Sequence, residues 1–286
     1  MTEIFIHAGL NKSASTYLQE HFFPLIKDAT FFCFHRNLDT GLLREDLGLK
    51  KKLIFSDESL LGVPIFLRAS CRSEERLSFV RNTKMLFPHA KIILCFREHS
   101  AFLISLYKQY LHVGGTLRFQ DFFDIANDSG YISKRELFFE ERIQMIRENF
   151  ENEPFIFTDV HLRSHRNKVI KGLLSYVGSS TKFEDLGLPS GKRENRGVGM
   201  VQSTLLRQLN RMSASALNPR GLLRLNCRVM RRLRLDPRTL CQDRLRFLSD
   251  RELVMPMAAK DYIRKKYAND WLQVLKHVNF EEFYTR

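Results

Sequence analysis

The chain has 286 residues, of which 44% are hydrophobic and 12% aromatic, enough to bury the core of one large domain. No apolar run approaches the roughly 20 residues of a membrane helix, and the N-terminus lacks a secretory-signal pattern, so we expect a soluble, cytoplasmic protein. Five scattered cysteines without a CxxC pair argue against disulfides and a zinc site, and no residue cluster has metal-ligand spacing. The net charge of +14 indicates an anionic partner such as nucleic acid, an acidic membrane surface, a polysaccharide or a nucleotide.

The first half of the chain alternates short apolar runs with amphipathic stretches, which is typical of a parallel β-sheet flanked by helices. Strands are predicted at Glu3–His7, Phe31–Phe34, Lys52–Ser56, Lys91–Arg97 and Pro154–Val160, and helices at Ala14–Phe23, Ser73–Phe87, Ala101–Val113, Glu136–Phe150 and Asn167–Val177. Beyond Pro189 an Arg-rich helical pattern is broken by prolines. We therefore expect one α/β domain over residues 1–286, with a core at 1–178, a loop at 179–200 and a helical elaboration at 201–286.

A turn of small residues follows the first predicted strand and reads Asn11-Lys12-Ser13-Ala14-Ser15-Thr16. Small residues at a helix start let an anion approach the unpaired backbone N–H groups, and Lys12 adds a full positive charge. A triphosphate-binding loop would place the lysine after its second glycine, which this turn does not do. The alternative interpretation is an ordinary helix start with Ser13 as its N-cap.

A second motif is the strand that ends at Arg97, with Ser105 eight positions later on the next predicted helix. A guanidinium group binds phosphate through two parallel hydrogen bonds, and a nearby hydroxyl can donate another. Glu98 would bring negative charge close to such a phosphate, so we expect its side chain to point away. The alternative is a strand end beside an ordinary helix-surface serine.

In this order and spacing, the two motifs resemble sulfotransferases that use 3′-phosphoadenosine 5′-phosphosulfate (PAPS), including bacterial and carbohydrate-type members with a fold like that of P-loop NTPases. The resemblance implies that Asn11 to Thr16 form the 5′-phosphosulfate loop, with Asn11 in place of the usual proline and Ala14 in place of the usual glycine. It implies that Arg97 and Ser105 bind the 3′-phosphate. The later loop resembles the cofactor-closing loop of the family, with candidate contacts at Arg193, Asn195 and Arg196.

The implied reaction moves a sulfuryl group from PAPS to a hydroxyl or amine without a metal ion, and Lys12 stabilises charge on the leaving phosphate. A base must take the acceptor proton. Glu58, which follows the strand Lys52–Ser56, is the candidate, and Asp57 and His35 are rivals.

The acceptor is expected to be a glycan or another hydroxylated small molecule, because a basic surface suits an acidic carbohydrate. Two other functions stay open. One is a nucleotide-dependent, kinase-like enzyme in which Asp57 holds Mg²⁺. The other is a non-catalytic polyanion- or RNA-binding protein, since residues 192–251 hold about fifteen Lys and Arg against about four Asp and Glu. Few aromatic residues are interleaved with those arginines, which makes nucleic acid an unlikely partner.

Overall fold

Five parallel strands form the centre of this computed structural model, which describes residues 2–10, 15–33, 51–58, 60–61, 69–188, 199–225, 228–245, 247 and 251–279, without the side chains of 69–73, 228 and 231. The strands are β1 (Glu3–His7), β2 (Thr30–Cys33), β3 (Lys52–Ser56), β4 (Lys91–Phe96) and β5 (Phe155–Thr158). Their order across the sheet is β2-β3-β1-β4-β5. The predicted α/β class, with a parallel sheet flanked by helices, is confirmed.

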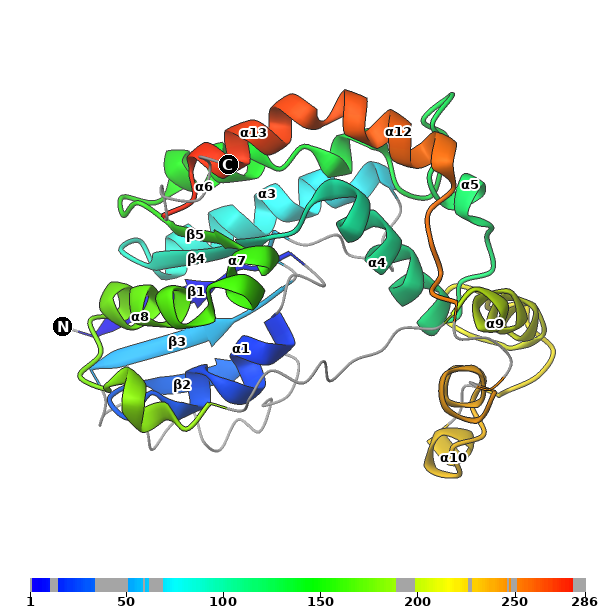
Figure 1. Cartoon of the computed structure of the whole chain (residues 1–286), viewed down its shortest axis with the longest axis horizontal. Coiled ribbons are helices and arrows are strands. Elements are labelled where there is room, and N and C mark those ends of the chain that lie inside the picture. The colour runs from blue at the N-terminus through cyan, green and yellow to red at the C-terminus, as the bar shows by residue number, and fades with distance from the viewer. Residues whose placement is uncertain are drawn as a thin grey trace.

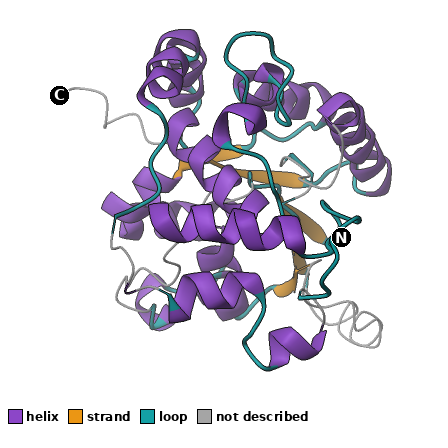
Figure 2. Ribbon diagram, turned by 90° about the vertical axis from the view of Figure 1, so that its right-hand side faces the viewer, coloured by secondary structure: helices purple, strands orange, loops and turns teal. Residues whose placement is uncertain are grey.

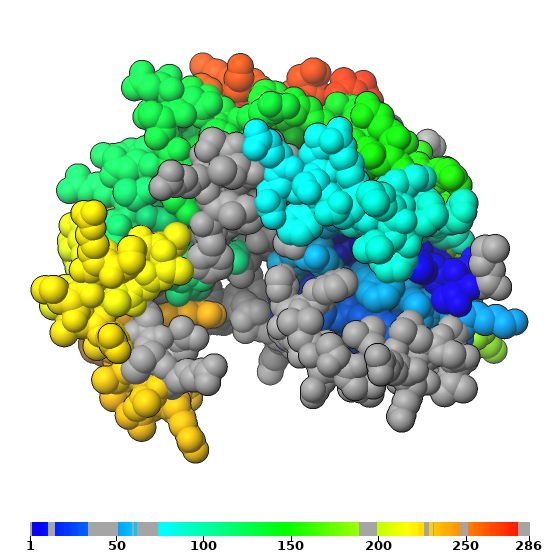
Figure 3. All heavy atoms as spheres, turned by 180° about the vertical axis from the view of Figure 1, so that it is seen from behind, coloured from blue at the N-terminus to red at the C-terminus, as the bar shows by residue number. Residues whose placement is uncertain are grey.

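Helices cover both faces of the sheet, as Figure 2 shows. Helices α1 (Ser15–His21) and α8 (Arg166–Val177) lie on the face toward the viewer in Figure 1, and α3 (Ala69–Leu86) lies on the opposite face, which Figure 3 turns to the front. This double cover explains why β4 is buried from Ile92 to Phe96. A continuous apolar run is what a parallel strand buried on both faces requires.

The connections around this core are short helices and turns. Between β1 and β3 the chain forms the 3₁₀ turn η1 (Phe23–Leu25), and between β4 and β5 it forms α4 (His99–His112), α5 (Phe119–Phe122), η2 (Lys134–Leu137) and α6 (Glu140–Asn149). After β5 come α7 (Asp159–Ser164), α8 and η3 (Phe183–Leu186). The C-terminal part is helical, as predicted, with α9 (Met200–Met212), α10 (Arg228–Arg232), α11 (Pro237–Thr239), the π-helical turn η4 (Leu240–Arg244), α12 (Met257–Lys266) and α13 (Ala268–Lys276).

The largest differences between predicted and observed boundaries are at the starts of α3 and α6: α3 begins four residues before the predicted Ser73, and α6 begins four residues after the predicted Glu136. Two smaller differences are explained by side-chain caps. Helix α4 begins two residues before the predicted Ala101, because the Glu98 carboxylate accepts hydrogen bonds from the backbone N–H groups of Ser100 and Ala101, both at 3.0 Å. Strand β5 ends at Thr158 rather than Val160, because the Thr158 hydroxyl caps the first turn of α7. These two caps stand directly beyond the carboxyl ends of β4 and β5.

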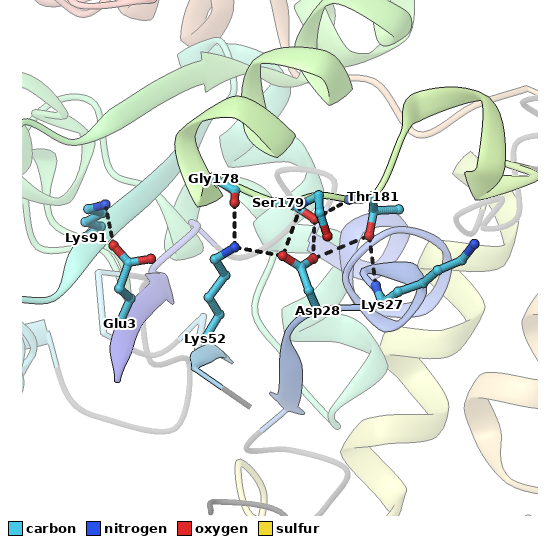
Figure 4. A network of polar contacts seen from close by, with 9 residues as sticks. Glu3, Lys27, Asp28, Lys52, Lys91, Gly178, Ser179 and Thr181 are labelled. Atoms are coloured by element: carbon cyan, nitrogen blue, oxygen red, sulfur yellow. Dashed lines mark hydrogen bonds and ion pairs between the residues drawn. The ribbon is translucent and has the colours of Figure 1, made fainter. Parts of the chain in front are cut away.

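The carboxyl end of α8 is tied to β2 and β3 by the carboxylate of Asp28 (Figure 4). Lys52 Nζ lies 2.7 Å from Asp28 Oδ2 and 2.5 Å from the carbonyl oxygen of Gly178. Ser179 Oγ and the Ser180 N–H also donate to Asp28, at 2.5 and 3.1 Å. Although burial acts in the opposite direction, these hydrogen bonds and the positive charge of Lys52 hold the pKa of Asp28 well below its ordinary value. The network fixes the start of the segment that was predicted as a loop.

A buried charged cluster joins α3, η2 and α6. Arg76 and Arg142 both pair with Glu136, and the Arg142 and Glu136 side chains are almost fully buried. Burial, and then the positive charge of Arg76, lower the pKa of Arg142 to about 9. Arg142 Nη1 also donates to the carbonyl oxygen of Leu61 at 2.9 Å, which anchors the chain shortly after β3.

The last helix is locked to α4 and α6 through Asp270. Its carboxylate accepts from the backbone N–H groups of Phe139 and Glu140 at 3.0 and 3.2 Å, at the start of α6. The same carboxylate lies 2.9 Å from Nε2 of His99, the first residue of α4. The His99 ring is stacked between Phe139 and Tyr267, with centroid distances of 4.3 and 5.2 Å.

Residues 200–251, which we call the C-terminal arm, lie on the side of the sheet toward which the strands run (Figure 1). Asn210 of α9 attaches the arm to the core, because its buried amide donates to the carbonyl oxygens of Leu111 and Gly115 at 2.8 and 2.9 Å. Across the described ranges, no helix has both the length and the apolar character needed to cross a membrane.

Candidate functional site

The candidate site lies at the carboxyl edge of the sheet, where the central strand β1 ends between β3 and β4. His7 is the register partner of Ser56 in β3 and of Ile93 in β4. The Asp57 N–H donates to the carbonyl oxygen of His7 at 3.0 Å, so β3 and β1 end side by side. The chain crosses from β3 to β4 over β1, and such a reversal of strand order is where open parallel sheets bind ligands.

A chain of three buried polar side chains lies at the end of β1. Gln19 of α1 donates from Nε2 to the Ser56 hydroxyl at 2.8 Å, and the same hydroxyl lies 2.8 Å from Nδ1 of His7. Among the described residues the Ser56 hydroxyl has no other acceptor, so it donates its own hydrogen to Nδ1. A neutral imidazole then carries its hydrogen on Nε2, which makes that edge of the ring a donor.

The donor edge of His7 faces the turn that begins with Ala8 and Gly9. Within the described part of the chain, neither His7 Nε2 nor the hydroxyl of Ser15 has a hydrogen-bond partner, although both atoms are buried. Both lie close to Gly9, since a Cβ added there would be 2.8 Å from His7 Nε2 and 3.1 Å from Ser15 Oγ. A buried donor without an acceptor is costly, so both atoms are candidate donors to an electron-rich ligand group at this turn.

The protonation state of His7 follows from its burial. The side chain is fully buried, and desolvation lowers its pKa from the ordinary value of 6.5 to about 4. His7 is therefore neutral at physiological pH. It offers a hydrogen bond to an anion without adding a positive charge.

Arg97 follows β4 directly, and its guanidinium group lies beside the start of α7. Its Nε is 3.4 Å from Asp159 Oδ2, and Arg163 pairs with the same carboxylate. Burial raises the pKa of the Asp159 carboxyl above its ordinary value, while the two arginines act in the opposite direction. Even when Asp159 is ionised, two guanidinium groups share its one negative charge.

The other predicted residues of this edge are placed as follows. Ser105 lies in the middle of α4, and Thr16 lies in the first turn of α1; both are partly buried. Asp57 and Glu58, which follow β3, are also partly buried, and both take part in further polar or electrostatic interactions. The Glu98 carboxylate is engaged with the backbone of α4, as described above.

Several predicted residues lie outside the described part of the chain. They are Asn11, Lys12, Ser13 and Ala14 of the turn, the rival base His35, and Arg193, Asn195 and Arg196 of the later loop. The assignments of these residues remain predictions.

Sequence reasoning missed the buried chain of His7, Ser56 and Gln19, and the carboxylate of Asp159. The available signal for His7 was a polar residue that ends a strand directly after the apolar run at residues 4–6 and directly before Ala8 and Gly9. No comparable signal pointed to Ser56, because its pairing with His7 depends on the register of two strands that are 49 residues apart in sequence. Metal-ligand clusters of three or more His, Cys, Asp or Glu side chains are absent from the described residues.

Comparison with known proteins gives similar structures but no similar sequences. No family model matches the chain, and no curated protein does. A sulfotransferase from Alicyclobacillus acidocaldarius shares 13% sequence identity over 68% of this chain and 77% of its own, with a TM-score of 0.41. Mouse sulfotransferase SULT7A1 complexed with PAP shares 14% identity over 65% of this chain and 62% of its own, with a TM-score of 0.39. At these values the likeness assigns no activity, which has to be argued from the side chains at the sheet edge.

Proposed function

We propose that this protein is a PAPS-dependent sulfotransferase that moves a sulfuryl group to a hydroxyl or amine of an acceptor. The observation that carries the proposal is the pair of buried donors, His7 Nε2 and Ser15 Oγ, which find no acceptor among the described residues. Ser15 belongs to the segment that resembles the 5′-phosphosulfate loop, and His7 ends the strand that precedes this segment. A phosphosulfate group presents several acceptor oxygens and would satisfy both donors.

Arg97 supports the second half of the proposal, recognition of the 3′-phosphate. Its guanidinium group stands beyond the end of β4, the strand next to β1, and shares the carboxylate of Asp159 with Arg163. Ser105 lies about 9 Å along the axis of α4 from the first residue of that helix. A phosphate held by both side chains would lie along the first turns of α4, and the carboxylate of Asp159 would keep the guanidinium group oriented when no phosphate is bound.

In this mechanism, the enzyme acts mainly by positioning and by electrostatics prepared in advance. Lys12 and the backbone N–H groups from Asn11 to Ala14 would stabilise the charge that grows on the leaving phosphate oxygen. Neutral His7 would donate a hydrogen bond to the phosphosulfate without adding a second cation to that of Lys12. Arg193, Asn195 and Arg196 would close over the bound nucleotide.

The proton of the attacking hydroxyl or amine would pass to a carboxylate at the end of β3. Glu58 is the proposed base, because it follows the strand next to β1 and its chain segment is anchored at Leu61 by Arg142. Asp57 is the alternative, since its backbone is bonded directly to His7. We propose a glycan or another hydroxylated small molecule as the acceptor, on the basis of the positive charge of the chain.

The test is calorimetric titration with adenosine 3′,5′-bisphosphate and, in parallel, with ADP. We expect the bisphosphate to bind more tightly, and Arg97→Ala to weaken it about 10- to 100-fold, the size of a lost charge-assisted hydrogen bond. Arg97→Lys keeps the charge but not the forked geometry, so its affinity for the bisphosphate should lie between those of the wild type and Arg97→Ala. Arg135→Ala, an exposed arginine of η2, is the matched control and should bind like the wild type.

Other outcomes would assign another function. A preference for ADP that depends on Mg²⁺ would favour the kinase-like enzyme. No nucleotide binding, together with salt-dependent binding to heparin or RNA, would favour the non-catalytic polyanion-binding protein. Either result would reject the sulfotransferase proposal.

A further inference from the structure

The C-terminal arm exposes an unusual share of the large apolar side chains of the protein. Eight of the fifteen exposed large hydrophobic residues in the described ranges lie within residues 200–251. Leu222 is 93% exposed and Phe247 is 79% exposed. Scattered single apolar residues on a surface need no explanation, but such a concentration in one segment indicates an interaction surface.

The arm is also strongly basic, and all of its basic residues are of one kind. Residues 200–251 contain twelve arginines, no lysine and three aspartates. Arginine is the residue that binds phosphate oxygens through two parallel hydrogen bonds and is weakly hydrated, so it suits a phosphate-bearing interface. The charge of the arm is therefore complementary to that of an anionic partner.

The apolar and basic side chains alternate along the same exposed stretches. Leu222 and Leu223 are exposed between Arg220 and Arg224, which are exposed as well. In and after α10, the exposed residues are Val229, Arg232, Leu233 and Arg234. A surface of this kind can place apolar side chains among acyl chains while its arginines remain at the level of the headgroups.

Other partners fit this surface less well. A polysaccharide would use the arginines but would leave the exposed leucines in water. Single-stranded nucleic acid would need stacking aromatics, and Phe247 is the only aromatic residue of the arm. A second copy of the chain would bring two arginine-rich surfaces together, which like-charge repulsion opposes.

We propose that the C-terminal arm docks the protein peripherally onto an anionic lipid membrane. The exposed leucines and Phe247 insert into the interface, and the arginines bind the lipid phosphates. The buried amide of Asn210 holds the arm against α4, so docking fixes the orientation of the whole domain. This inference is independent of the proposed sulfotransferase activity.

The experiment is flotation of the full chain with vesicles of phosphatidylcholine alone, and with vesicles containing about one-third phosphatidylglycerol. We expect at least about tenfold stronger partition into the anionic vesicles, weakened by high salt. The double variant Leu222→Ser/Phe247→Ser should reduce this partition about tenfold or more. Both side chains are largely exposed, so the variant should keep the thermal unfolding midpoint of the wild type.

The matched control is Met85→Ser/Leu86→Ser, at two apolar residues that are 81% and 72% exposed at the end of α3, outside the arm. It should float like the wild type. The proposal would be overturned if the protein bound neutral and anionic vesicles equally well, or if it bound neither. It would also be overturned if the two double variants lost the same amount of binding to anionic vesicles. Sedimentation equilibrium is a second measurement on the same variants. A dimer of the wild type that Leu222→Ser/Phe247→Ser dissociates would assign the surface to a second copy of the chain and would also overturn the proposal.

Discussion

Acidification should destabilise the fold through His7 in a pH range where carboxylates contribute little. In the folded chain its pKa is lowered from 6.5 to about 4, so the unfolded chain binds a proton between these values and the folded chain does not. The contribution of neutral His7 to the free energy of unfolding is therefore fully present above pH 6.5 and is lost as the pH is lowered toward 4. Between about pH 7.5 and about pH 5, this one residue lowers the free energy of unfolding by about 2 kcal/mol.

The assay is urea unfolding at the two pH values for the wild type and for His7→Asn. An asparagine amide can keep the hydrogen bond to Ser56, but it does not titrate and has no donor at the position of Nε2. The variant should lose about 2 kcal/mol less than the wild type on acidification. His89→Asn is the control, because this histidine is exposed and its ion pair with Glu151 contributes little. If wild type and His7→Asn show the same dependence on pH, His7 is not buried as a neutral donor and the reasoning fails.

Three further substitutions test the packing around the site. Gly9→Ala would place its Cβ 2.8 Å from His7 Nε2, so we expect a loss of about 1–3 kcal/mol of stability and weaker binding of the bisphosphate; unchanged unfolding and unchanged titration would contradict the tight turn. Glu136→Gln removes the charge shared by two buried arginines and should cost about 3–5 kcal/mol in urea unfolding, whereas a loss below about 1 kcal/mol would mean that the cluster is solvated. Asp28→Asn should cost about 2 kcal/mol at neutral pH. Because the pKa of Asp28 is lowered by folding, the wild type should lose this contribution as the pH falls below the ordinary range of a carboxyl, and the variant should not.

The strands could be predicted from sequence because burial on both faces leaves a local pattern. β1 and β3 match their predicted bounds, and β4 differs only at Arg97. Two of the boundary errors fall where one side chain ends one element and begins the next, whereas the starts of α3 and α6 were each missed by four residues. Thr158 and Val160 continue an apolar, β-branched pattern, but the Thr158 hydroxyl caps α7 and ends the strand. Glu98 was considered only as an unfavourable charge, whereas its carboxylate starts α4.

Sequence reasoning could predict only those site residues that directly follow a strand in the chain. The turn after β1 and Arg97 after β4 were found because each follows a strand directly. The partners of these residues depend on which strands are neighbours. Asp159 reaches Arg97 because β4 pairs with β5, and Ser56 reaches His7 because β3 pairs with β1. No local pattern contains that information.

The bond between Asp270 and His99 has a consequence for how the chain can be divided. The two residues are 171 positions apart, yet one carboxylate holds the first residue of α4 and the first turn of α6. A fragment that stops before α12 would retain all five strands but would leave His99 without its acceptor and without the Tyr267 ring that covers it, and α6 without its cap. All five strands are made before residue 160, but α4, the helix that follows Arg97, reaches its final position only after α13 has been made.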